Sequence, residues 1–267
     1  MKILGIEVDE VNRQEAIEKI SGWVGGKGSL KHVVTIYSEF LLAAEKDKVF
    51  RKAVEKADLV VPDGVGVLAA MEYKRGKKGL FDGLGVGLKG LRGELGQPVT
   101  GVWLFEELVR LAAEKGWKVF LLGEKGDASH RLKMVLKKRY KNLRVESDPG
   151  GQDWKENTGK RNEEVLKKIN EFAPDVLFVV YGPVNQIKWI ENNRRKLGVK
   201  VAIGVGGTFN EVLGEFARAP KWMEKRGLKA VWRLLVQPKR LPRIFRAMVM
   251  FPWKVYKETF KVRPCRC

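Results

Sequence analysis

Apolar runs and amphipathic stretches alternate along most of the chain. Short runs rich in Val, Ile, Leu and Phe are spaced as buried strands, at 2–6, 32–36, 59–61, 117–122, 143–146, 175–180 and 199–203. Apolar positions at helical spacing fall between them, at 12–24, from 38 onward, and at 48–56, 104–115, 127–140, 160–172 and 185–197. Asn12 followed by Glu15 predicts a capping box at the first of these helices. Apolar strands that alternate with helices predict an α/β fold over residues 1–215, with a mostly parallel sheet and helices on both faces.

Residues 76–101 break this rhythm. They contain nine of the 29 glycines, and Leu80, Leu84, Leu88, Leu91 and Leu95 recur among them at roughly helical spacing. Each glycine weakens a helix by up to ~1 kcal/mol relative to alanine. We therefore expect a glycine-rich insertion that forms a mobile lid or a loosely helical loop.

The last part of the chain, residues 216–267, forms a second unit in the pattern. The whole chain has 52 Lys and Arg against 32 Asp and Glu, and residues 221–267 hold 14 of the basic residues but only two acids, Glu224 and Glu258. An apolar stripe alternates there with Arg240, Arg243 and Arg246, and consists of Leu241, Ile244, Phe245, Met248 and Val249. Such a basic amphipathic helical appendage favours an anionic membrane surface. Nucleic-acid binding and packing of the stripe on the protein's own domain are the alternatives.

The composition excludes several classes of protein. The chain has 267 residues, of which 44% are hydrophobic, so a disordered protein is excluded. No apolar run reaches the ~18–20 residues of a membrane span, and acids occupy the N-terminal segment where a secretion signal needs apolar residues. We expect a cytoplasmic protein that is soluble or peripheral to the membrane. The only cysteines are Cys265 and Cys267 and the only histidines His32 and His130, which argues against a disulfide scaffold, a histidine metal centre and a Ser/His triad.

Glycine-rich turns follow several predicted strands. Asp63-Gly64 follows the strand at 59–61, Gly123 and Gly182 follow two others, and Gly204, Gly206 and Gly207 follow the last. Backbone N–H groups in such turns can approach a phosphate, and parallel sheets bind ligands at this edge, so the set predicts a crevice for a phosphorylated ligand. Asp63 is placed there as a general base, with capping of the next helix as its structural alternative.

The spacing of these glycines does not settle the ligand by itself. Residues 64–69 also fit a dinucleotide fingerprint, but glycine turns after strands are common, and we expect no cofactor. The chain has no Asp-x-Asp pair of the kind that holds a metal ion on a nucleotide-sugar diphosphate. If the ligand is a diphosphate, backbone N–H groups and arginines must balance its charge without metal, and Arg218, Arg233 and Arg240 are the candidates.

Several segments together resemble the WecG/TagA/CpsF glycosyltransferase family in order and spacing. They are Val33–Thr35 with Glu39-Phe40, Ala57–Gly64, Val99–Val102, Val119–Gly123, Gln186 with Lys188–Ile190, Ile203–Gly207 and Arg218–Met223. The resemblance covers most of residues 1–245. It implies a Rossmann-like fold and an inverting transfer of an N-acetylmannosamine-type sugar from a UDP-sugar to a polyprenyl-diphosphate-linked acceptor in cell-envelope polymer synthesis.

The resemblance also implies roles for individual residues. Asp63 falls on the family's proposed base and Thr35 on a position lining the same pocket. The turns at Gly64, Gly123, Gly182 and Gly204–Gly207, with Gln186, match the substrate side. Arg218, Arg233 and Arg240 match arginines of an appendage that closes over the site at the inner face of the membrane. Family members also assemble as dimers or trimers, so a homo-oligomer is compatible with the resemblance.

The chain departs from the family pattern at polar positions near the expected pocket. Tyr37 replaces the usual Asn, Pro98 an Arg, and Trp103 and Asn210 an Asp each. These changes favour an altered substrate. A catalytically silent member that binds lipid diphosphate or scaffolds an envelope assembly is the alternative from another class, and a basic nucleic-acid-binding module is a third.

Overall fold

The computed structural model describes residues 1–76, 79–124, 126–151, 159–215 and 245–261, together with Pro220, Trp222, Met223, Trp232 and Pro242. Its centre is a six-stranded sheet in the order β4-β3-β8-β7-β5-β6, and every pairing is parallel. The strands are β3 (Lys31–Ile36), β4 (Leu59–Pro62), β5 (Lys118–Gly123), β6 (Arg144–Asp148), β7 (Val176–Val180) and β8 (Val201–Gly204). The predicted parallel, Rossmann-like sheet is confirmed.

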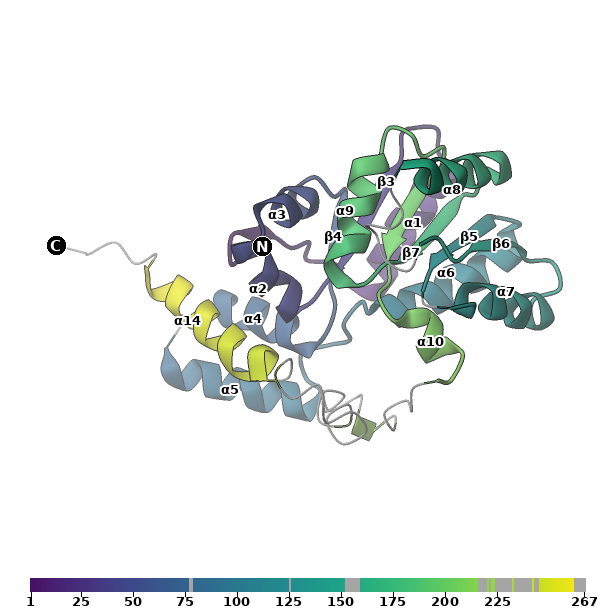
Figure 1. Ribbon diagram of the computed structural model, residues 1–267. Coiled ribbons are helices and arrows are strands. Elements are labelled where there is room, and N and C mark those ends of the chain that lie inside the picture. The colour runs from purple at the N-terminus through teal and green to yellow at the C-terminus, as the bar shows by residue number, and fades with distance from the viewer. Residues whose placement is uncertain are drawn as a thin grey trace.

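Helices cover both faces of the sheet (Figure 1). Neighbouring residues of a strand point to opposite faces, and Val33 and Val34 accordingly belong to different parts of the core. One face carries α1 (Arg13–Gly25), α6 (Gly101–Lys115), α7 (Ala128–Arg139) and α10 (Thr208–Val212). The other carries α2 (Ser38–Lys46), α3 (Lys48–Glu55), α4 (Val65–Arg75), α8 (Gly159–Phe172) and α9 (Pro183–Asn193). The capping box of Asn12 and Glu15 is present at α1.

The N-terminal segment differs from its prediction as one strand. It forms an antiparallel hairpin of β1 (Lys2–Ile3) and β2 (Ile6–Glu7), which turns at Leu4 and Gly5 with φ of 47° and 81°. The short turn lets both Ile3 and Ile6 enter the core beside α2 and α3.

The glycine-rich insertion contains a regular helix, α5 (Leu80–Arg92), where we expected a mobile lid or a loosely helical loop. Its glycines serve close packing on α4: a Cβ at Gly83 would lie 3.7 Å from the Tyr73 ring, and one at Gly90 only 3.3 Å from Val65. Val86 packs into the same core cluster. Tertiary contact with α4 thus offsets the weak helix propensity of this segment.

The described end of the chain is docked on the body of the protein. A π-helical turn, η2 (Arg246–Met250), leads into α14 (Phe251–Lys261), in which Phe251, Val255 and Thr259 are buried. Glu258 accepts hydrogen bonds from the backbone N–H groups of Leu4 and Gly5 and pairs with Lys74 at 2.7 Å. The division of the chain at residues 215 and 216 stays a prediction, since residues 216–219 lie outside the described part. No helix among the described residues is long and apolar enough to cross a membrane.

Candidate active site

The candidate site lies at the carboxyl edge of the sheet, where β3 and β8 are neighbours. After β3 the chain enters α2 on one face of the sheet, and after the neighbouring strand β8 it enters α10 on the other face, where α10 packs with α6 and α7. Such a divergence of connections at the carboxyl ends of two adjacent strands marks the usual ligand position in open α/β sheets.

Asp63 stands at this edge, directly after β4. Its backbone N–H donates to the Ile36 carbonyl at 2.8 Å, which ties it to the end of β3. Its Oδ2 accepts a hydrogen bond from the backbone N–H of Gly101, the first residue of α6, at 3.2 Å. The helix that follows, α4, has Gly64 as its N-cap, and the helix N–H that Asp63 binds belongs to α6, so the role of Asp63 as base stays a prediction beside its contact with a helix start. The side chain is half-buried.

Thr35 lies on β3 beside the same groups. Its side chain is 4% exposed, and its hydroxyl donates to the Gly204 carbonyl of β8 at 3.3 Å. A Cβ at Gly101 would lie 3.5 Å from the Thr35 hydroxyl and 3.4 Å from the Val205 carbonyl, so the start of α6 is in contact with both strands. Thr35 therefore braces the edge of the sheet, and its predicted place in the substrate pocket stays a prediction.

Gln186 is a buried side chain that supports the turn at Gly204–Gly207. Its side chain is 1% exposed, and its Oε1 accepts a hydrogen bond from the Gly206 N–H at 3.0 Å. A Cβ at Gly204 would lie 2.8 Å from the Gln186 side chain, so only glycine fits there. Gln186 thus holds the turn that the sequence places at the substrate, and its own contact with the substrate stays a prediction.

The turns after β5 and β7 complete this edge. Gly123 pairs with Val180 in the sheet, and a Cβ on it would collide with the Val180 carbonyl at 2.3 Å. At Gly64, Gly182, Gly206 and Gly207, by contrast, no atom of the described residues other than the glycine and its two chain neighbours lies within 4 Å of a Cβ position. These glycines border open space, and their backbone is accessible to a ligand.

Two groups at this edge were missed by the sequence analysis. The Gly101 N–H was hidden because nothing in its local pattern links it to Asp63, although Thr100 is a typical N-cap. Tyr181 follows β7, and its buried hydroxyl has no hydrogen-bond partner among the described residues. Burial, with the Asp148 carboxylate nearby, raises the pKa of Tyr181, so the phenol stays protonated and able to donate. Arg218, Arg233 and Arg240 lie outside the described residues.

Comparison with known proteins shows which family the chain belongs to. A profile of the glycosyl transferase WecG/TagA/CpsF family matches residues 1–81 and 79–264. The chain belongs to this family. The resemblance read from the sequence is thereby confirmed, and the protein is a glycosyltransferase.

Relatives within the WecG/TagA/CpsF family align over nearly the whole chain. The chain is similar to the N-acetylglucosaminyldiphosphoundecaprenol N-acetyl-beta-D-mannosaminyltransferase of Staphylococcus aureus strain MRSA252, with 26% identity over 265 residues that cover 99% of this chain and 95% of that protein. The protein of the same name in strain NCTC 8325 / PS 47 is 25% identical over 265 residues, with the same coverage.

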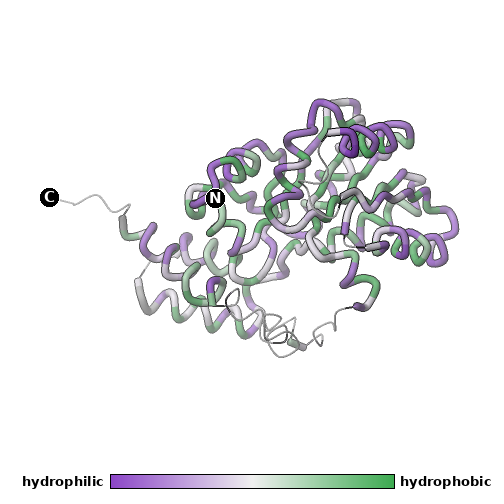
Figure 2. The backbone as a smooth tube through the Cα atoms, viewed as in Figure 1, coloured by the Kyte–Doolittle hydropathy of each residue, from purple (hydrophilic) through white to green (hydrophobic). Residues whose placement is uncertain are grey.

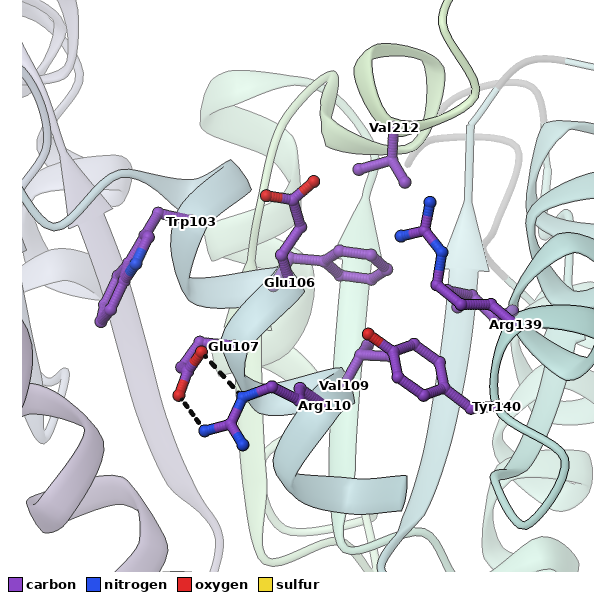
Figure 3. A pocket seen from close by; sticks show the side chains of 10 residues that line it. Trp103, Glu106, Glu107, Val109, Arg110, Arg139, Tyr140 and Val212 are labelled. Atoms are coloured by element: carbon purple, nitrogen blue, oxygen red, sulfur yellow. Dashed lines mark hydrogen bonds and ion pairs between the residues drawn. The ribbon is translucent and has the colours of Figure 1, made fainter. Parts of the chain in front are cut away.

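In this WecG/TagA/CpsF chain the carboxyl edge is distinct from a surface pocket of about 330 Å³ on the outer side of α6, α7 and α10 (Figure 3). Glu107 and Arg110 pair within that pocket, and Arg139 and Tyr140 line its opposite wall. None of the described candidate-site residues lines it. The part of the chain that the structure describes also holds no group of three or more His, Cys, Asp or Glu side chains that could bind a metal ion.

Proposed function

We propose that the protein transfers an N-acetylmannosamine-type sugar from a UDP-sugar to a sugar carried on a polyprenyl diphosphate. The acceptor is suggested by the Staphylococcus aureus relatives, whose name describes an N-acetylglucosaminyl-diphosphoundecaprenol acceptor. The observation that carries the proposal is the position of Asp63, held by the Gly101 N–H at the sheet edge that also presents the open glycine turns. A base and phosphate-accessible backbone on one edge are what a transfer from a sugar diphosphate needs.

In this mechanism Asp63 takes the proton of the acceptor hydroxyl. The freed oxygen attacks the anomeric carbon of the donor and forms the new glycosidic bond. The bond from that carbon to the diphosphate oxygen breaks on the opposite side, and UDP leaves with the electron pair, which inverts the anomeric centre. Asp63 acts as the catalytic residue because it touches the reacting hydroxyl, whereas Thr35 and Gln186 act as positioning residues.

Charge on the departing diphosphate is balanced by the chain itself in this proposal. The turns at Gly64, Gly182 and Gly207 offer their backbone N–H groups to the donor phosphates, while Gly123, Gly204 and Gly206 shape the edge, with the Gly206 N–H held by Gln186. Arg218, Arg233 and Arg240 of the basic tail add positive charge from the side of the membrane, which we expect to be the inner face. Exposed apolar side chains at Phe245, Met248, Val249 and Trp253 support association of this tail with a lipid surface.

A transfer assay tests the proposal. The full chain is supplied with candidate UDP-sugars and a short-chain polyprenyl-diphosphate N-acetylglucosamine, and UDP release and product mass are measured. We expect Asp63→Asn to lower kcat by about 10²–10⁴-fold, since it removes the general base. Glu114→Gln, at the far end of α6 with a half-exposed side chain, is the matched control and should leave turnover unchanged. Unchanged turnover in Asp63→Asn refutes its role as base, and no transfer with any UDP-sugar refutes the donor class.

A further inference from the structure

Helix α5 has a packed face and a bare one. Gly83, Val86 and Gly90 face α4. On the opposite side Leu84, Leu88 and Leu91 follow the i, i+4, i+7 spacing of one helical stripe and are 67%, 47% and 51% exposed. Soluble monomers rarely leave a contiguous apolar stripe of this kind in water. The stripe therefore indicates a partner.

Exposed apolar side chains are also concentrated near α5. Twelve large hydrophobic side chains are exposed in the described part of the chain, and eight of them lie on α5 or in residues 245–261. Both α5 and α14 pack on α4, at the same end of the molecule (Figure 1). Figure 2 shows the alternation of hydrophobic and hydrophilic residues along both helices. One end of the protein thus carries most of its exposed apolar side chains.

Charge at this end selects the occupant. Arg92 directly follows Leu91, is mostly exposed and has its nearest acid, Glu94, 3.9 Å away, whereas Lys89 pairs with Glu72 of α4. Lys257 lies over the Trp253 ring at 4.9 Å. The chain as a whole carries a net charge of +20. Two copies of so basic a chain repel one another, whereas an anionic bilayer attracts it. Apolar side chains flanked by basic ones fit the boundary between headgroups and acyl chains.

Helix α5 also lies close to the candidate site. Gly90 lies against Val65, and Val65 begins α4 directly after Asp63-Gly64. The carboxyl end of α5 is therefore near the loop that carries the base. A bilayer that holds α5 also positions this loop close to the lipid surface, where a lipid-linked sugar is presented.

We infer that α5 is a membrane-inserting helix: Leu84, Leu88 and Leu91 enter the interface of an anionic bilayer and hold the Asp63 edge at its surface. This is a second anchor besides the basic tail. The inference rests on the proposed function only in that the acceptor is lipid-linked.

Vesicle flotation tests the anchor. The full chain is mixed with vesicles of phosphatidylglycerol and phosphatidylcholine, and its partition coefficient is compared with that of Leu84→Glu/Leu88→Glu. We expect the variant to bind at least about tenfold more weakly, because two apolar side chains are lost from the interface. The control is Met134→Glu/Val135→Glu on α7, which removes two equally exposed apolar side chains elsewhere and should leave binding unchanged.

Site-specific labelling gives an independent readout that does not depend on a charged substitution. Leu88→Cys and, as control, Met134→Cys are made with Cys265→Ser and Cys267→Ser, and each is labelled with a polarity-sensitive fluorophore. Vesicles should shift the emission at position 88 to the blue and leave position 134 unchanged. Equal behaviour of the two positions, or equal flotation of the glutamate variant and the parent, overturns the inference.

Self-association of the chain and loss of transfer activity are each distinguished from membrane anchoring by one further measurement. If sedimentation velocity shows a dimer that Leu84→Glu/Leu88→Glu dissociates while flotation is unaffected, the stripe is a self-association surface and the inference is wrong. Transfer to a water-soluble acceptor analogue should survive in the glutamate variant. If the parent chain transfers no sugar at all, the proposed function fails, and flotation and labelling still decide the role of α5.

Discussion

The carboxylate of Asp63 and the backbone amide of Gly101 are joined by a 3.2 Å hydrogen bond across 38 residues of sequence. Gly101 begins α6, and the first N–H groups of a helix have no acceptor within the helix. The bond satisfies one of these donors and orients the carboxylate at the end of β4. The position of Asp63 therefore depends on two elements, and a substitution that displaces the backbone at Gly101 should alter catalysis without touching the substrate.

Substitutions at Gly101 should separate by size. A Cβ there would be in ordinary contact with the Val205 carbonyl and the Thr35 hydroxyl, so Gly101→Ala should keep activity and stability close to those of the parent. Gly101→Val adds methyl groups that must displace the start of α6 and with it Asp63. We expect kcat to fall by about 10²-fold, as for other small displacements of a catalytic group, with little change in KM. Steady-state kinetics and thermal unfolding of the two variants check this, and equal kcat values would contradict it.

Gly204 and Gln186 should be energetically coupled. Gly204→Ala places a Cβ 2.8 Å from the buried Gln186 side chain, and we expect a loss of about 1–3 kcal/mol in the free energy of unfolding. Gln186→Ala leaves the Gly206 N–H without its acceptor and should cost a similar amount, about 1–3 kcal/mol. The double variant should lose less than the sum, because the alanine at 186 removes the clash. Urea unfolding of the parent, the two single variants and the double variant measures the four free energies of unfolding. Strict additivity would show that positions 186 and 204 do not interact.

Stability should fall in mild acid because of His32. Burial holds the pKa of His32 below its ordinary value of 6.5, while the neighbouring Glu191 opposes the shift. Arg194, Asp58 and Lys31 lie in the same cluster at the amino end of β3. Below pH 6.5 the unfolded chain takes up a proton that the folded chain does not. The free energy of unfolding therefore decreases as the pH is lowered, at most by about 1.4 kcal/mol per pH unit.

The window between about pH 6.5 and 5 isolates this histidine. Hydrogen bonds and ion pairs outweigh burial and lower the pKa values of Asp58 and Glu191, so their contributions are lost only at lower pH. His32→Gln should flatten the slope of stability against pH in this window. His130→Gln, on the exposed side of α7, serves as control. An unchanged slope in His32→Gln would show that the histidine does not titrate on unfolding there.

Docking of α14 should depend on Glu258 more than on Lys74. Glu258→Ala leaves the N–H groups of Leu4 and Gly5 without acceptors, and we expect a loss of about 1–3 kcal/mol. Lys74→Met removes the partly exposed ion pair and an exposed hydrogen bond to the Lys2 carbonyl but leaves both backbone bonds to Glu258, so its cost should stay below about 1 kcal/mol. Hydrogen exchange of residues 251–261 measures the docking. Faster exchange in Lys74→Met than in Glu258→Ala would reverse the ranking.

Much of the architecture was predictable because it is encoded locally. The alternation of apolar strands and amphipathic helices predicted the parallel sheet, and Asn12 with Glu15 predicted the capping box of α1. Asp63 at the end of a buried strand predicted its place at the carboxyl edge. In each case the signal lies within one helix or strand, where spacing and residue type act through short-range geometry.

Tertiary structure decided what depends on distant partners. Glycines that weaken α5 as an isolated helix allow its close approach to Tyr73 and Val65. Thr35 and Gln186, expected at the substrate, are buried and hydrogen-bonded to the backbone of Gly204 and Gly206. Glu258 meets Leu4 across 254 residues. The sequence by itself determined which segments are strands and helices. The packing of segments far apart in the chain determined which polar groups lie at the carboxyl edge of the sheet, because such contacts exist only once the topology brings those segments together.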